Sequence, residues 1–139
     1  MCSASRPGAD PGSRCPCGGD AYGRCCGPFH AAVAVAPTAE RLMRSRYSAF
    51  AVGDAAYLLR TWHPSTRPAS LELDDGLEWK RLLVEACEAG GPFDATGRVT
   101  FTAIAREGGS RLVQRERSRF AREGGAWFYV DGTTLDPEL

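Results

Sequence analysis

Four cysteines close to the start of the chain have the types and spacing of a metal site. They are Cys15, Cys17, Cys25 and Cys26, two pairs separated by seven residues. Zinc takes four tetrahedral ligands, and thiolate sulfur suits its borderline softness. The glycines around the pairs let the backbone turn sharply around an ion, and backbone N–H groups in such turns can hydrogen-bond to sulfur. We therefore predict one structural zinc ion (Zn2+) bound by these four thiolates.

The segment that carries these cysteines has little else to hold it together. Residues 15–28 contain few large apolar side chains, so burial alone would not fold them. Metal binding supplies folding free energy to segments of this kind. Four thiolates around one zinc ion would leave net negative charge, which Arg14 and Arg24 are placed to offset in part.

Other interpretations of the cysteines stay open. The thiols could be reduced surface groups, or they could form two disulfides, which would have to cross the loop because adjacent and Cys-x-Cys pairs are strained. His30 lies four residues after Cys26 and is a rival ligand, in competition with a packing or surface role. Of the remaining cysteines, Cys2 falls in a loose start of the chain. Cys87 falls on an apolar stripe, where burial is expected.

Length and composition indicate one globular domain with a small appendage. The chain has 139 residues, 43% of them apolar, and charges of both signs are mixed along it. The formal net charge is zero, which argues against a protein that grips nucleic acid through its phosphates.

The sequence predicts a cytoplasmic location and no membrane partner. Residues 1–14 lack the continuous apolar stretch of a signal peptide. The longest apolar run, residues 31–36, is far shorter than the about 20 residues that a membrane span needs. In the cytosol, the six cysteines would serve metal binding or redox chemistry rather than permanent disulfides.

Helical signals begin after Pro37. Thr38 is placed to cap a first helix that Gly53 ends, and Asp54 is placed to cap a second helix that Pro64 stops. Apolar residues recur at helical spacing in both segments.

A third helix is predicted over residues 75–90. Asp75 and Glu78 resemble a capping box, and Gly90 would end the element. One stripe of this helix would carry Trp79, Leu82, Leu83, Ala86 and Cys87.

After Pro92 the pattern changes to the two-residue alternation of strands. Strands are predicted at 98–106, 111–122 and 127–133, with a fourth near 70–73. Paired glycines at 108–109 and 124–125 supply the positive φ angles of tight hairpins. Helices followed by an antiparallel meander predict an α+β domain, with about three helices packed on one face of a curved antiparallel sheet.

The strand at 111–122 carries an unusual inward carboxylate. Alternation places Gln114, Glu116, Ser118 and Phe120 on the face toward the helices. A buried Glu116 needs partners. The candidates are Arg46, His63, Ser118 and Tyr129. In an open pocket Glu116 and His63 would be plausible acid or base groups, whereas in a packed core they would belong to a structural hydrogen-bond network. No nucleophile is paired with a base at recognisable spacing, so the sequence favours a binding protein over an enzyme.

The other face of this strand is basic, because it carries Arg115, Arg117 and Arg119. A solvated outer face is the simpler interpretation. A docking strip for an acidic partner or RNA is the alternative.

Several segments resemble known motifs. Cys-Pro-Cys-Gly-Gly at 15–19, followed by Tyr22 and by Cys-Cys-Gly-Pro at 25–28, resembles the SEC-C zinc motif, named for the C-terminal tail of the preprotein translocase ATPase. Further segments are Leu-Met-Arg-Ser-Arg-Tyr-Ser-Ala-Phe at 42–50, Tyr-Leu-Leu-Arg-Thr-Trp-His-Pro at 57–64, Glu-Arg-Ser-Arg-Phe at 116–120 and Trp-Phe-Tyr-Val-Asp-Gly at 127–132. Together they resemble the YchJ-like family of small bacterial proteins, from Cys15 to about Thr134.

The resemblance implies an N-terminal SEC-C knuckle joined to a domain similar to nuclear transport factor 2, a cone of helices and curved sheet. We accordingly divide the chain into a disordered segment at 1–14, a zinc knuckle and linker at 15–36, an α+β cone domain at 37–134 and a tail at 135–139. The inner spacing of seven residues departs from the family's usual eight, so a ligand swap that involves His30 stays open.

Two functions follow as hypotheses. The translocase tail that the motif resembles docks partners, so the first hypothesis is a zinc-binding protein-interaction module. Its knuckle, with Arg14 and Arg24, would bind a protein or ribosome-associated partner. The alternative is a small-molecule binding protein or enzyme that uses the cone interior, with pocket residues His63, Glu116, Ser118 and Tyr129. The sequence does not indicate the oligomeric state.

Overall fold

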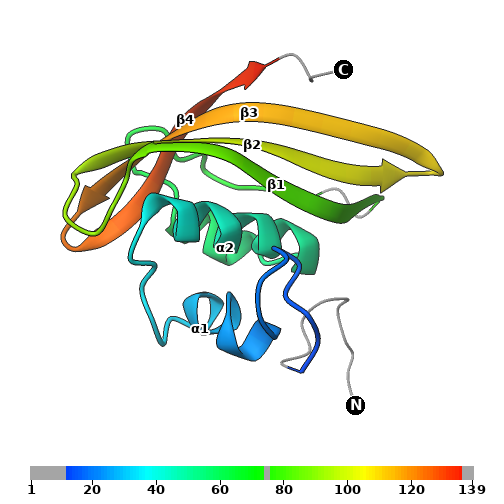
Figure 1. The fold of residues 1–139 in the computed structure, drawn as a ribbon, viewed down its shortest axis with the longest axis horizontal. Helices are drawn as coiled ribbons and strands as arrows, with labels where there is room; N and C mark the ends of the chain where they lie inside the picture. The colour runs from blue at the N-terminus through cyan, green and yellow to red at the C-terminus, as the bar shows by residue number, and fades with distance from the viewer. Residues whose placement is uncertain (1–11, 74–75, 136–139) are drawn as a thin grey trace.

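The computed structural model describes residues 12–73 and 76–135 and places a curved antiparallel sheet beside a group of helices (Figure 1). The strands are β1 (Leu77–Ala89), β2 (Thr96–Glu107), β3 (Ser110–Glu123) and β4 (Ala126–Leu135), in that order across the sheet. The helical elements are η1 (Tyr22–Arg24), α1 (Gly27–His30), α2 (Ala39–Val52) and α3 (Ala55–Arg60). Helix α2 lies between the sheet and the N-terminal segment with α1 (Figure 1). The predicted α+β class is confirmed.

Helices α2 and α3 begin where local signals predict, and α2 also ends at the predicted residue, whereas α3 ends at Arg60, before the predicted stop at Pro64. Thr38 Oγ1 accepts a hydrogen bond from the Arg41 N–H at 3.1 Å, and Gly53 ends α2 with a φ of 80°, an angle that glycine adopts without strain. The Asp54 side chain accepts from the Tyr57 N–H at 3.0 Å and caps α3. None of the helices in the described part of the chain has the length and apolar character needed to cross a membrane.

The two predicted hairpins are also present. Gly108 and Gly109 join β2 to β3 with φ angles of 59° and 89°, and Gly124 and Gly125 join β3 to β4 with φ angles of 59° and 83°. Two successive residues with positive φ give a turn that matches the twist of antiparallel strands. Glycine adopts such φ angles with little strain.

The predictions of a third helix at 75–90 and of a strand near 70–73 are wrong. Residues 77–89 form β1, and residues 70–73 lie in no strand. Register shifts between Trp79 and Arg81 and between Val84 and Ala86 place an extra residue in β1 at two points. The residues that pair opposite the core positions of β2 are therefore Trp79, Leu82, Val84 and Cys87. Bulges thus turned a two-residue period into an uneven spacing that resembles a helix.

The structure also bears on the predictions for Cys87 and for the start of the chain. Burial of Cys87 is wrong, because this side chain is exposed on β1 and its Sγ donates to Glu40 Oε1 at 3.5 Å. Cys2, Asp75 and most of the predicted loose segment at 1–14 lie outside the described residues. Within that segment, Arg14 pairs with Ala21 in an isolated antiparallel bridge.

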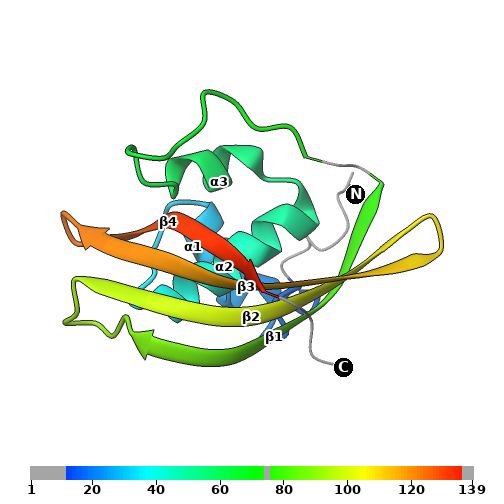
Figure 2. The same cartoon turned by 90° about the horizontal axis from the view of Figure 1, so that it is seen from above.

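The core of the main domain lies between the concave face of the sheet and α2 with α3 (Figure 2). Its buried apolar members include Leu42, Met43, Tyr47, Leu58, Val99, Phe101, Ala103, Phe120 and Trp127. Full burial of a large apolar side chain contributes about 1.5–3 kcal/mol. The end of α3 is also tied to β4, because the Tyr129 N–H donates to the Thr61 carbonyl at 2.8 Å and the His63 N–H to the Tyr129 carbonyl at 2.7 Å. Apolar packing therefore holds the sheet against α2 and α3, and the same buried cluster continues to Phe29 and the four cysteines.

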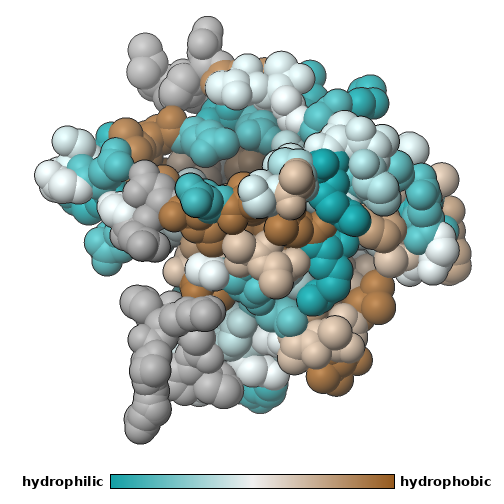
Figure 3. Space-filling view, turned by 180° about the vertical axis from the view of Figure 1, so that it is seen from behind, coloured by the Kyte–Doolittle hydropathy of each residue, from teal (hydrophilic) through white to brown (hydrophobic). Residues whose placement is uncertain are grey.

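The surface is mixed rather than dominated by one character. The face opposite to that of Figure 1 shows apolar and polar areas interspersed (Figure 3). A chain with zero formal net charge has no reason to show one large charged field.

Candidate metal centre

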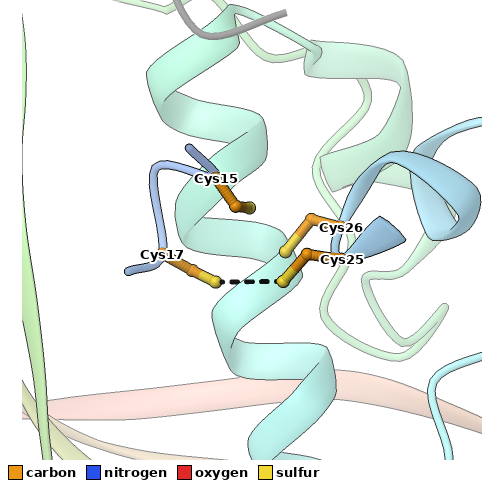
Figure 4. A group of neighbouring side chains, drawn as sticks. All are labelled: Cys15, Cys17, Cys25 and Cys26. Atoms are coloured by element: carbon orange, nitrogen blue, oxygen red, sulfur yellow. Dashed lines mark hydrogen bonds between the residues drawn. The ribbon is translucent and has the colours of Figure 1, made fainter. Parts of the chain in front are cut away.

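The four cysteines come from two tight stretches of backbone and lie together beside α2 (Figure 4). In the first, the Cys15 N–H donates to the Asp20 carbonyl at 3.0 Å and the Gly18 N–H donates to the Cys15 carbonyl at 2.9 Å. In the second, the Cys25 N–H donates to the Tyr22 carbonyl at 3.1 Å at the end of η1. The four Sγ atoms all lie within 4.8 Å of one another. The structure thus brings the whole predicted ligand set together.

The spacing of the sulfurs fits a single tetrahedral ion. A Zn–S bond of about 2.3 Å puts two sulfurs of one tetrahedron roughly 3.8 Å apart. The Sγ atoms of Cys17 and Cys25 are 3.6 Å apart, far beyond the S–S bond of about 2 Å in a disulfide. All four cysteines are free and largely buried. They form a group that could hold a metal ion.

Helix α2 supports this group from the side of the main domain. Ser48 is fully buried, and its Oγ lies 3.4 Å from Cys15 Sγ and 3.3 Å from Cys26 Sγ. One turn earlier, Arg44 Nη1 donates to the Cys17 carbonyl at 3.3 Å. Hydrogen bonds from surrounding groups to the residues that bind a metal fix the orientation of those residues. The cysteine group is therefore anchored to the main domain at two points.

Gly19 sits where a side chain would collide with the sulfurs. A Cβ at this position would lie 2.8 Å from Cys25 Sγ and 3.4 Å from Cys17 Sγ. Its backbone hydrogen bond to Cys17 also favours the thiolate form of that residue. The glycine is thus required by the closeness of the sulfurs and contributes to their electrostatics.

Thiols packed this closely restrain one another's ionisation. Hydrogen bonds from Cys17 and Cys26 hold the pKa of Cys15 well below its ordinary value. The same contact with Cys15 raises the pKa of Cys17 to about 11 and raises that of Cys26 even further. A coordinating thiol, by contrast, is deprotonated by the charge of its metal ion. All four cysteines can therefore be thiolates at neutral pH only when a cation lies among them.

His30 takes the packing role that the sequence left open beside the ligand role. Its Nε2 lies 2.8 Å from the Ser45 carbonyl, which can only accept, so Nε2 donates. Nδ1 of the neutral ring then accepts from the Tyr22 hydroxyl. Burial lowers the pKa of His30 below 6.5 and favours this neutral form. Both ring nitrogens are used, and the group within ligand distance consists of the four cysteines. Despite the short inner spacing, the structure does not use His30 as a replacement ligand.

The two arginines expected to offset the charge of the centre make local contacts at its edge. Arg14 Nη2 donates to the Gly18 carbonyl at 3.4 Å. Arg24 has a side chain that is 77% exposed and lies 3.5 Å from the Asp20 carboxylate. Both stay close to the cysteine turns.

A second candidate site is a cavity of about 330 Å³ between α2 and the sheet. Glu116 and Ser118 line it, as strand alternation predicted, and Tyr129 of β4 lines it too. Glu116 Oε2 accepts from Ser118 Oγ at 2.7 Å, with the Tyr129 hydroxyl at 3.5 Å, and Oε1 accepts from Gln114 Nε2 at 3.1 Å. A Cβ at Gly132 would overlap the Glu116 carboxylate, so this glycine makes the inward position possible.

Arg46 lines the same cavity but does not bind Glu116 directly. Its Nη1 donates to the Leu58 carbonyl at 2.8 Å and to Thr61 Oγ1 at 2.7 Å. The guanidinium carbon lies 4.5 Å from the centre of the Tyr129 ring. The sequence suggested Arg46 only as a partner of Glu116, because its contacts with α3 and β4 depend on tertiary structure.

His63 lies apart from the cavity residues. Its Nε2 is 2.7 Å from Glu123 Oε2, and its Nδ1 is 2.8 Å from Ser65 Oγ. The structure therefore does not bring His63 to Glu116 as an acid or base partner. Two of the arginines on the outer face of β3 form ion pairs, since Arg115 lies 2.9 Å from Glu85 and Arg119 lies 2.6 Å from Asp131. Those ion pairs fit a solvated outer face.

Solved structures with this arrangement carry the SEC-C motif. The solution structure of a SEC-C motif containing protein from Rhodopseudomonas palustris aligns with a TM-score of 0.77 at 33% identity, over 88% of this chain and 99% of that chain. The crystal structure of a SEC-C motif containing protein from Psychrobacter arcticus aligns with a TM-score of 0.67 at 26% identity, over 86% of this chain and 75% of that chain. The fold and the cysteine group thus define a class of proteins in which a SEC-C type cysteine group is attached to an α+β domain.

Sequence relatives narrow the class to a family. Residues 38–132 match the family model described as the middle, NTF2-like domain of YchJ. The UPF0225 protein SCO1677 of Streptomyces coelicolor is 58% identical over 123 residues, which cover 88% of this chain and 96% of that protein. The UPF0225 protein CE1570 of Corynebacterium efficiens is 57% identical over 124 residues, which cover 88% and 95%. The chain belongs to the YchJ-like family, to which these UPF0225 proteins are related, and the predicted resemblance is confirmed.

Proposed function

We propose that the four thiolates bind one zinc ion in a structural role. The observation that carries this proposal is the group of four cysteine Sγ atoms within 4.8 Å of one another. Structural zinc sites are closed by four protein ligands, whereas catalytic sites keep a position for water or substrate. Four cysteines leave no such position.

The proposed role is to fasten the N-terminal segment to the main domain. Ser48 and Arg44 of α2 contact the cysteine group, and Arg46 of the same helix lines the cavity. Zinc binding would therefore brace one wall of the cavity. We also propose a cytoplasmic location, where thiols stay reduced and available to metal.

Elemental analysis with native mass spectrometry tests the metal. The full chain, purified without added zinc, is expected to carry one zinc ion per molecule. A Cys87→Ser variant, altered at an exposed cysteine, is expected to carry the same amount. Iron in place of zinc, or a metal-free native protein, would contradict the proposal.

Docking of a protein or ribosome-associated partner is a second proposal for the knuckle. It is supported by the exposed Arg24 and by Arg14, which lie at the edge of the cysteine turns. A pull-down compares the intact protein with the double variant Arg14→Ser and Arg24→Ser, which leaves all four ligands in place. Partners that depend on the arginines are expected, and identical partner sets would count against docking.

The cavity supports the alternative function, binding of a small molecule. Its volume of about 330 Å³ falls at the low end of the roughly 300–1,000 Å³ typical of ligand pockets. Glu116 already accepts from Gln114 and Ser118, and His63 lies elsewhere. These contacts support binding in the cavity more than acid–base catalysis.

A further inference from the structure

Arg46 is a buried cation whose hydrogen-bonding capacity is only partly used. The residue is 5% exposed and lines the cavity. Both of its hydrogen bonds start at Nη1, and none in the described part of the chain uses Nε or Nη2. These two nitrogens form one edge of the planar guanidinium, the edge that can pair side-on with a carboxylate.

The charge of Arg46 has no close anionic partner among the described residues. Burial lowers its pKa to about 10, which reflects the cost of removing the cation from water. Glu116 lines the same cavity but forms no ion pair with Arg46 within 4.0 Å. The carboxylate is instead satisfied by Gln114 and Ser118. The cavity therefore contains satisfied acceptors and unused donors.

A second unused donor belongs to the same wall. Trp62 lines the cavity, and its Nε1 is the one buried side-chain nitrogen or oxygen without a hydrogen-bond partner in the described part of the chain. The Arg46 guanidinium carbon lies 5.3 Å from the centre of the Trp62 ring. Buried donors without partners are rare in native structures. Trp62 thus adds a donor without a partner beside the Arg46 guanidinium, whose Nε and Nη2 edge is the part of this wall that a ligand acceptor in the cavity can reach.

The other walls of the cavity indicate the shape of the ligand. They are mainly aromatic or apolar and include Met43, Phe50, Trp79, Phe101 and Phe120. Aromatic walls favour a flat apolar body through offset stacking and edge-to-face contacts. A phosphate would bring about two negative charges at neutral pH into a space that offers one cation and already contains Glu116. A single carboxylate matches the charge of Arg46.

We propose that the cavity binds a small carboxylic acid with a flat apolar body, its carboxylate on Arg46 and its body between the aromatic side chains. This inference rests on the proposed binding role of the cavity and names its ligand class. It can be tested separately from the zinc proposal, because the ligand would contact Arg46 and the aromatic walls rather than the cysteines.

The experiment compares benzoate with benzamide, which has nearly the same shape but no charge. Both are titrated into the zinc-loaded full chain and followed by amide NMR and thermal shift. Benzoate is expected to perturb the signals of α2 and β3 and to bind at least about ten-fold more tightly than benzamide, since a hydrogen bond to a charged group contributes about 1.5–3 kcal/mol. Arg46→Gln should remove this preference, and Glu116→Gln should strengthen benzoate binding by removing a repulsive charge. Arg98→Gln, altered at an exposed arginine outside the cavity, should change nothing.

Three results would overturn the inference in different ways. Equal affinity for benzoate and benzamide would refute the carboxylate while leaving the binding role of the cavity intact. Binding that survives Ala103→Leu, which fills the cavity from β2, would show that the probe binds elsewhere. If benzoate, indole-3-acetate and 2-naphthoate all fail to bind, the ligand class and the binding role of the cavity both fall. If Arg46→Gln fails to fold, the effects of Glu116→Gln and Ala103→Leu on benzoate binding still test the inference.

Discussion

The knuckle and the cone are held together by different forces, and α2 belongs to both. The cone encloses fully buried apolar side chains such as Leu58 and Val99. In the knuckle, η1 buries no residue, α1 buries only Phe29, and the other buried groups are the cysteines themselves. The comparison teaches that one small protein can combine a domain that folds by burial with a segment whose buried groups are mainly cysteines that could hold a metal ion.

The two regions meet on opposite sides of one helix. Arg44 and Ser48, four residues apart, contact the cysteine group. Met43, Arg46 and Tyr47 line the cavity. Helical periodicity separates these sets, because residues four apart share a face. A change at the knuckle can therefore reach the cavity through α2, and Arg60 of α3 forms a second link because its Nη2 donates to the Phe29 carbonyl at 3.1 Å.

Loss of one ligand should separate the regions most strongly. Cys26→Ser removes a thiolate from a closed site, and structural zinc contributes about 10–16 kcal/mol of apparent binding free energy in small zinc-finger peptides. Zinc affinity should fall by several orders of magnitude, as measured with a competing chelator. Amide signals of the knuckle should lose dispersion while those of the sheet remain. Cys87→Ser is the control, and wild-type zinc affinity in Cys26→Ser would contradict the assigned ligands.

Two glycine substitutions sharpen the comparison. Gly19→Ala places a methyl group against Cys25 and Cys17, whose sulfurs a metal would hold in place, so zinc affinity should fall by up to about 100-fold. Gly132→Ala places a methyl group against the Glu116 carboxylate. This carboxylate is the end of a flexible side chain, so it can turn away from the methyl group. Gly132→Ala should leave zinc affinity unchanged and alter only the cavity signals. Equal effects of both variants on zinc would show that the regions are not distinct.

Removal of a supporting hydroxyl should have a smaller effect. Ser48→Ala deletes the Oγ that lies beside Cys15 and Cys26, and loss of such a contact typically weakens metal binding by about 10-fold or more. Ser45→Ala is the matched control, because this buried serine on the same helix contacts the Tyr57 hydroxyl instead. Competitive zinc titration compares the zinc affinities of Ser48→Ala and Ser45→Ala. Equal affinities would show that Ser48 does not support the metal centre.

The smallest expected effect is a pH dependence through His30. Burial lowers its pKa below 6.5, so the unfolded chain takes up a proton at a higher pH than the folded chain. The contribution of the neutral ring is complete above that value, and it is lost as pH falls through the lower pKa of the folded state. Urea unfolding of zinc-loaded protein should show decreasing stability below about pH 6.5, with a flatter profile in His30→Gln. Zinc content is measured at each pH, and identical profiles would contradict this role of His30.

Local signals predicted much of this molecule from the sequence. The caps at Thr38 and Asp54, the glycine pairs of the hairpins and the cysteine pairs each act over a few residues. Their physical effect does not depend on the rest of the fold. The alternation that turns Glu116 inward is local in the same way.

What the sequence did not reveal depends on distant contacts. The bulges of β1 are set by pairing with β2, and they made Trp79 and Leu82 look helical. The position of His30 requires Ser45 and Tyr22 together, and the unused donors of Arg46 and Trp62 become evident only when α2 meets the end of α3. His63 was misplaced for the same reason, because its partner Glu123 lies on β3, sixty positions away along the chain.

The central claim is that sulfur-bound zinc organises the knuckle while the cone folds by burial. Amide NMR of the full chain before and after complete zinc removal by a chelator tests it most directly. We predict that signals of residues 12–30 collapse toward unfolded positions while those of β2 and β3 stay dispersed, and that added zinc restores the original spectrum. Equally dispersed knuckle signals in the metal-free protein would contradict the claim.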